Sequence, residues 1–192
     1  MPLIFTGNRS RLLKTGQTTS YGSGTGVDDG ALQKGIAKSY TVIPQVGNTN
    51  IVLNGKTDVH TNNVVFDNNT GLMWSQTLSA SVGPASDGKI PWTTNANGEG
   101  VFAFCAAANA ANLGNYNDWR VPNVFELASL IDYEPPNGTP DAIAFPGWTT
   151  GNVWTSTTAP DSSIAAKYII FATGSISGAQ KITNYFCALV RS

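Results

Sequence analysis

The sequence predicts an α+β protein in which two helices lie to one side of small antiparallel sheets. Three observations lead to this fold class: an Asn-Gly pair between two β-forming runs near residue 54, two stretches with apolar residues at helical spacing between residues 100 and 134, and a return to β-forming residues after residue 147. Since the helices fall between two groups of strands along the chain, we expect them to be segregated from the sheet strands.

The first group of strands is expected between residues 51 and 74. Asn54-Gly55 separates residues 51–53 from residues 56–59, and this dipeptide is a strong signal for a tight hairpin. A second pair of strands is predicted within residues 64–74, with its turn at residues 68–71. Residues 77–99 contain five glycine and proline residues and are expected to be loop.

The first helix is predicted over residues 100–114. Val101, Phe104, Cys105, Ala108 and then Ala111 or Asn112 follow the i, i+3, i+4, i+7 and onward spacing of one helix face, and Gly114 stands where a C-terminal cap belongs.

The second helix is predicted to start at Asn123, because Glu126 follows three residues later in a variant of the capping box. Pro135 and Pro136 are expected to stop it. The expected core face consists of Val124, Leu127, Leu130 and Ile131.

The closing strands are predicted at residues 153–158, 166–173 and 185–190, with a turn at residues 174–178 between the last two. Residues 1–45 are expected to form an extended N-terminal arm because they are rich in glycine, threonine and serine and show no sustained periodicity. Residues 46–192 form the expected domain. Such an arm becomes ordered by lying on its own domain or on a neighbouring subunit.

The low charge of the chain excludes several functions. Eleven basic and twelve acidic residues give a formal net charge of −1, so no field attracts nucleic acid. No apolar run is long enough to cross a membrane, and the first residues lack the pattern of a secretion signal. We therefore expect synthesis in a cytoplasm, with release by another route such as lysis. A polar surface with only 12% charged residues is typical of adhesins and virion proteins.

Five short motifs, taken in order, resemble the Lcl C-terminal domain family. They are residues 67–74 (DNNTGLMW), Cys105 on an alanine-rich helix, residues 118–127 (DWRVPNVFEL), residues 154–157 (WTST), and Cys187 near a final Val-Arg. Residues 14–21 and 28–35 also resemble the leader of many members, so the likeness spans residues 14–191. Residues 41–63 match poorly and suggest an inserted hairpin.

The resemblance implies a C-type-lectin-like fold of the formylglycine-generating-enzyme branch, in which N- and C-terminal strands pair and two helices flank a small sheet. Members are mostly binding modules on bacterial surfaces and in phage particles. Within that fold, Cys105 and Cys187 would form a disulfide between the first helix and the last strand. The alternative is a pair of buried reduced thiols, because a cytoplasm is reducing. A catalytic pair would need both cysteines beside a cleft, and their placement argues against it.

Several other residues have expected roles. Trp74, Trp119 and Trp154 lie inside the family motifs and are expected in the core, each with its indole N–H on a carbonyl group. Arg120 is expected to form a buried pair with Glu126. These roles are structural.

Ligand-binding candidates come from the loops. Trp92 and Trp148 lie in glycine- and proline-rich segments, where an exposed ring can stack on a sugar or anchor a partner protein. His60, the only histidine, is expected to face solvent from a strand, which leaves no catalytic residues. One histidine and two distant cysteines offer no metal site, and no cofactor is expected.

These features lead to one main hypothesis and two alternatives. The main hypothesis is a non-catalytic structural and binding protein of a bacteriophage virion, in capsid decoration or at a tail or fibre tip, attached through its arm to copies of itself or to other virion proteins. A glycan or protein on the cell surface is expected as a further partner. The first alternative is a secreted bacterial surface adhesin that binds glycans, and the second is a formylglycine-generating-type oxidase.

Overall fold

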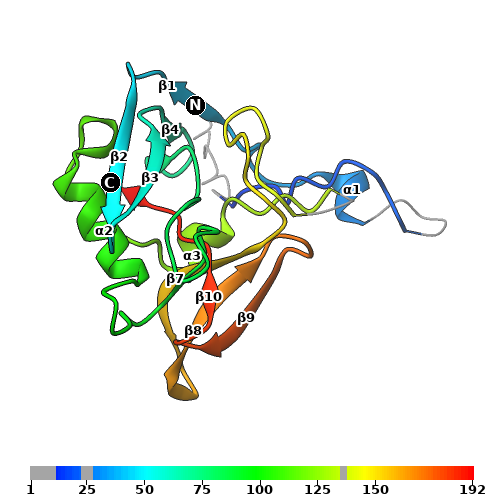
Figure 1. Ribbon diagram of the computed structural model, residues 1–192. Helices are drawn as coiled ribbons and strands as arrows, with labels where there is room; N and C mark the ends of the chain where they lie inside the picture. The colour runs from blue at the N-terminus through cyan, green and yellow to red at the C-terminus, as the bar shows by residue number, and fades with distance from the viewer. Residues whose placement is uncertain (1–11, 23–27, 135–137) are drawn as a thin grey trace, which may run out of the picture.

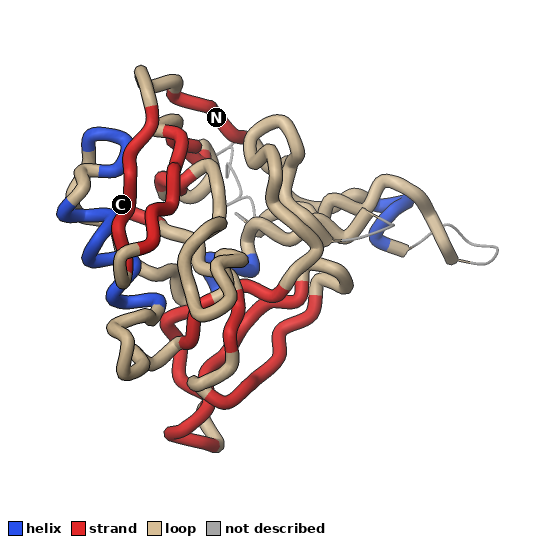
Figure 2. Tube along the Cα trace, in the orientation of Figure 1, coloured by secondary structure: helices blue, strands red, loops and turns tan. Residues whose placement is uncertain are grey.

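A computed structural model describes residues 12–22, 28–134 and 138–192, and it has an α+β architecture (Figures 1 and 2). The main sheet is antiparallel and contains β1 (Tyr40–Ile43), β4 (Val64–Asp67), β5 (Met73–Ser75) and β11 (Val190–Arg191), in the order β1-β4-β5-β11. In this sheet the end of the chain returns to its middle, because Val190 of β11 lies opposite Trp74 of β5. Both expected strand pairs of the first group are confirmed.

The predicted hairpin consists of β2 (Asn48–Leu53) and β3 (Lys56–Thr61). Its two-residue turn needs positive φ at both central positions, and Asn54 and Gly55 have φ values of 51° and 71°. The turn between β4 and β5 is held by Asp67, whose carboxylate accepts hydrogen bonds from the Thr70 hydroxyl and two backbone N–H groups.

The second sheet has the order β7-β8-β9, with β7 at Asn152–Ala159, β8 at Ser162–Ile170 and β9 at Ser175–Gln180. The expected turn at residues 174–178 is wrong, because most of it is strand β9. The chain reverses just before, where Thr173 donates to the Ile170 carbonyl and Gly174 has a φ of 66°. Within the expected loop 77–99, β6 (Ile90–Pro91) pairs with β10 (Asn184–Tyr185).

The first predicted helix is present but shorter than expected. Helix α2 covers Val101–Ala110, and its buried residues are the first four predicted for its core face. The predicted fifth position, Ala111 or Asn112, lies after the helix, and neither residue is buried. The helix ends before Gly114, because Asn112 adopts the left-handed conformation and a 3₁₀ helix follows at Leu113–Asn115.

The second predicted helix, α3, covers Val124–Ala128 and has a complete capping box between Asn123 and Glu126. Leu130 and Ile131 are buried in the turns after the helix has ended. Pro135 and Pro136, expected to stop the helix, lie outside the described residues.

Two buried clusters form the core, and the β7-β8-β9 sheet lies between them. Neighbouring residues of a strand point to opposite faces. Thus Val153 and Ile169 belong to one cluster, whereas Trp154 and Tyr168 belong to the other. Both faces of β7 and β8 are therefore covered by core side chains.

The N-terminal segment before residue 39 stands out from this body with the short helix α1 (Asp29–Leu32) (Figure 1). A parallel bridge between Leu13 and Ile36 closes it at its base. Strand β1 belongs to the main sheet although it falls within the expected arm 1–45, of which residues 1–11 and 23–27 lie outside the described part. No described helix has both the length and the apolar character to cross a membrane.

Candidate functional site

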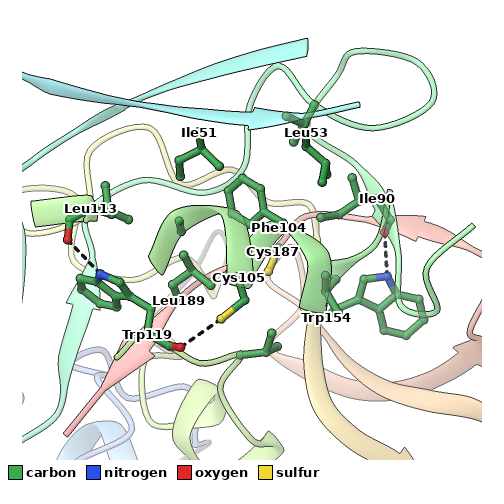
Figure 3. Packing of buried hydrophobic residues seen from close by; sticks show 14 of the residues in the cluster. Ile51, Leu53, Ile90, Phe104, Cys105, Leu113, Trp119, Trp154, Cys187 and Leu189 are labelled. Atoms are coloured by element: carbon green, nitrogen blue, oxygen red, sulfur yellow. Dashed lines mark hydrogen bonds between the residues drawn. The ribbon is translucent and has the colours of Figure 1, made fainter. Parts of the chain in front are cut away.

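The two cysteines lie in one core cluster, one on α2 and the other before β11 (Figure 3). Both are buried free thiols, and Cys105 donates a hydrogen bond to the Trp119 carbonyl at 3.1 Å. Burial raises the pKa of Cys105 to about 11. The pKa of Cys187 is raised well above its ordinary value by complete burial and by the neighbouring Cys105 thiol. Of the two alternatives, the structure contains the reduced pair.

The three motif tryptophans are fully or almost fully buried. The indole N–H of Trp119 donates to the Leu113 carbonyl at 2.9 Å, and that of Trp154 donates to the Ile90 carbonyl at 3.1 Å. The expectation is wrong for Trp74, whose indole N–H has no hydrogen-bond partner within the described part of the chain.

Arg120 and Glu126 form a two-pronged ion pair, with both N···O distances at 2.7 Å. The hydrogen bond from Arg120 is the main reason why the pKa of Glu126 is lowered, although partial burial opposes it. The same carboxylate accepts a hydrogen bond from the Asn123 N–H and so begins α3. The pair is not buried as expected, because 42% of the Arg120 side chain is exposed.

An open groove of about 530 Å³ runs between α2, residues 119–123 and the middle of β7. The ring of Phe102 lies in this groove and is 41% exposed. The Asn109 amide also lines it but is engaged with the Trp119 backbone, at 2.7 and 2.8 Å. The remaining polar lining comes from Arg120, Asn123 and Ser156. An aromatic ring beside polar groups suits a ligand with mixed polarity, such as a sugar.

The two loop tryptophans differ. Trp92 is half-buried and its ring meets that of Phe102 edge to face, with centroids 4.7 Å apart. Its N–H donates to the Thr155 carbonyl at 2.7 Å, and the Lys181 ammonium lies 4.0 Å above its ring. Trp92 therefore supports the groove through Phe102.

Trp148 is not an exposed ligand-binding ring. It is only 7% exposed, its N–H donates to the Gln76 carbonyl at 3.0 Å, and it packs edge-on against Phe145 and Phe171. The sequence-based prediction was wrong because Trp148 belongs to the buried cluster that also contains Val153 and Ile169.

His60 is buried, although the sequence predicted that it faces solvent. It is 2% exposed, with Nδ1 3.0 Å from the Thr77 hydroxyl and Nε2 3.4 Å from an Asp58 carboxylate oxygen. The face of β3 that carries Asp58 and His60 points toward the core. The centroid of the His60 ring lies 5.6 Å from that of the Phe104 ring. These contacts tie the hairpin to residues 77–80, because Asp58 also accepts from the Ala80 N–H at 2.8 Å.

Phe102 was missed because an apolar residue beside the core face of a helix has no distinct pattern in the sequence. One signal was available in the sequence. Phe102 lies next to the predicted core face, whereas Phe104 lies on it, so the Phe102 ring could be expected to reach the surface. Metal-binding groups do not supply another site, since no cluster of three or more His, Cys, Asp or Glu side chains occurs within the described ranges.

The comparisons with known proteins assign a family. No curated protein matches the chain. The family model of the Lcl C-terminal domain matches residues 63–191, which is more than half of the sequence. The matched region begins after the β2–β3 hairpin and contains the groove and both cysteines. The chain therefore belongs to the Lcl C-terminal domain family.

Proposed function

We propose that this chain is a non-catalytic structural and binding protein of a bacteriophage virion, in capsid decoration or at a tail or fibre tip. Its body, with a C-type-lectin-like fold, presents the groove beside Phe102, and its N-terminal segment attaches it to neighbouring subunits. The proposal rests mainly on the exposed apolar side chains of that segment, Tyr21, Leu32 and Ile36. A projecting segment with exposed apolar side chains can bury them against another subunit.

The segment is joined to its own body largely by polar contacts. The Glu134 carboxylate accepts hydrogen bonds from the backbone N–H groups of Thr18 and Thr19 and from the Thr19 hydroxyl. The Tyr133 N–H donates to the Thr15 carbonyl at 2.9 Å. These contacts fix the direction of the segment while its apolar side chains remain uncovered, as an attachment arm requires.

The non-catalytic part of the proposal is supported by the chemistry of the buried groups. The thiolate is the reactive form of cysteine, and burial raises the pKa of both thiols. A formylglycine-type oxidase would need both sulfur atoms beside its substrate cleft, whereas Cys187 is covered by the core. The His60 imidazole is likewise enclosed, with its nitrogens directed at Thr77 and Asp58.

The virion setting is supported by the composition. Only 12% of the residues are charged, and the net charge is −1, so many copies can lie side by side with little repulsion. Synthesis in the host cytoplasm also agrees with two free thiols. The expected partners are further copies of the chain and other capsid or tail proteins.

Immunogold electron microscopy of purified virus particles tests the location. We expect regular labelling with an antibody against this chain, and absence of the chain from particles would refute the virion role. Attachment is tested by removing residues 1–38, a boundary that leaves β1 in its sheet. The truncated chain should keep its melting temperature and fail to enter particles, whereas normal incorporation would refute the role of the segment.

One observation favours the adhesin alternative, namely the Phe102 ring beside Arg120 and Asn123 in the groove. Stacking of a sugar on this ring would be lost in Phe102→Ala. Phe125→Ala is the matched control, because Phe125 is 82% exposed and does not line the groove. A glycan array should show binding by the wild type and the control but not by Phe102→Ala. Equal binding by all three would exclude this groove.

A further inference from the structure

Strand β9 (Ser175–Gln180) forms a free edge of the second sheet, at the rim of the molecule (Figures 1 and 2). Among the strands of the described residues it pairs only with β8. The unpaired edge of a strand presents a row of backbone N–H and C=O groups to solvent, which is a template for another strand.

The edge lacks the features by which proteins protect such strands. Its six residues, Ser-Ile-Ser-Gly-Ala-Gln, include no charged residue and no proline. Its register with β8 is regular over six pairs, whereas the register between β7 and β8 contains irregularities. By contrast, β1 at the edge of the main sheet has four residues and is followed by Pro44. A regular, uncharged edge is suited to pairing.

We propose that β9 pairs antiparallel with β9 of a second copy of this chain, about a two-fold axis at Gly178. The two sheets would then join into one, with three strands from each copy. In this register Ile176 lies opposite Gln180 of the second copy, and both are exposed. A self-complementary patch of this kind is what a two-fold interface needs.

The absence of charged residues in β9 favours a second copy of the chain as the pairing partner. Strands that carry charges repel their own copies when directly opposed, and β9 carries none. Gly178 has no side chain at the axis, so the two backbones can approach closely there. Since a pair of six-residue strands buries less than the roughly 1,600 Å² of a standard interface, we expect dimerisation to depend on concentration. Many copies held in one assembly would strengthen it.

A cross-link at the axis tests the register. A Cβ atom at Gly178 would meet nothing closer than 3.9 Å, so Gly178→Cys should fold normally. Opposed residues of antiparallel strands have Cα atoms about 4.5–5.5 Å apart, which suits a disulfide. Mild oxidation should therefore link Gly178→Cys into dimers. Ser163→Cys, exposed at the far end of β8, is the control and should stay monomeric on denaturing gels.

A charged substitution at the axis tests the same interface without a covalent cross-link. Gly178→Lys would place two lysines together at the axis, each close to Lys167 of its own chain. Sedimentation velocity should show a dimer for the wild type and for Ser163→Lys but a monomer for Gly178→Lys, all with similar melting temperatures. A wild type that remains monomeric up to its solubility limit would overturn the proposal, as would a Gly178→Lys dimer or the absence of the cross-link.

The test is separate from that of the N-terminal segment. The pairing of β9 does not involve residues 1–38, so the truncated chain should still dimerise in solution. Loss of the dimer on truncation would overturn pairing through β9. Failure of the truncated chain to enter particles concerns only the attachment role.

Discussion

The body and the N-terminal segment are held in place by different forces. The body surrounds fully buried side chains such as Phe104 and Trp154, and burial of apolar area is the main source of stability, at about 25 cal/mol per Å². The segment before residue 39 rests on polar contacts such as those of Glu134, and exposed polar contacts contribute little. From this comparison we predict that the body keeps its fold when the segment is removed, because the segment adds little buried apolar area.

The largest effect should come from the body. Phe104→Ala would leave a cavity between α2 and the hairpin and should lower the free energy of unfolding by about 3–5 kcal/mol. Thermal unfolding followed by circular dichroism measures this effect. Tyr21→Ala in the segment is the control and should leave the melting temperature unchanged. An equal effect of the two substitutions would break the distinction between the regions.

The second-largest loss of stability is expected from a substitution in the buried thiol pair. Cys187→Ser would bury a hydroxyl in place of sulfur and should cost about 1–3 kcal/mol. A reductant should not change the melting temperature of the wild type, because both thiols are free. A lower melting temperature in reductant would show that the protein in solution contains a disulfide.

Acid should weaken the body through Asp58. Burial raises the pKa of Asp58, but the neighbouring His60 imidazole and hydrogen bonds from backbone N–H groups outweigh it, so the pKa is lowered. The folded state then gains stability from the ionised form at pH values above the unfolded pKa of about 3.9, and loses it as the pH falls through the lower folded value. Asp58→Asn should cost about 1–2 kcal/mol at pH 7 and reduce this acid sensitivity. Chemical denaturation from pH 7 to pH 3 tests it, and an unchanged pH profile would contradict the role of Asp58.

The smallest effect on stability should come from Glu134. Glu134→Gln weakens the contacts to Thr18 and Thr19 and leaves the core untouched. Limited proteolysis should cut the segment before residue 39 faster than in the wild type, with no change in melting temperature. If the melting temperature fell as well, the segment would be part of the cooperative unit of the body.

Local signals in the sequence predicted the elements that are determined locally. The Asn54-Gly55 turn, the capping box at Asn123 and the core face of α2 each depend on a few neighbouring residues. Other elements depend on contacts between residues far apart in the sequence and were not predicted. Glycines at 174 and 178 suggested a turn, yet pairing with β8 makes Gly178 part of a strand.

The candidate site was harder to predict for the same reason. The sequence paired Arg120 with Glu126, which are close along the chain. It could not show that Trp148 is covered by residues distant in sequence, or that the alternate face of β3 places His60 against Phe104. The groove exists only because α2 and β7 come together, so Phe102 could not be recognised in advance.

The pairing of β11 with β5 has a consequence for biosynthesis. Leu189 and Val190 are buried, and residues 189–191 bond to Ser75, Arg120 and Met73, yet they leave the ribosome after every other part of the body. The main sheet therefore cannot be completed until residues 189–191 have left the ribosome. A nascent chain halted before residue 187 should expose apolar surface and depend on chaperones, whereas a chain whose residues 187–191 have emerged should be able to close the sheet.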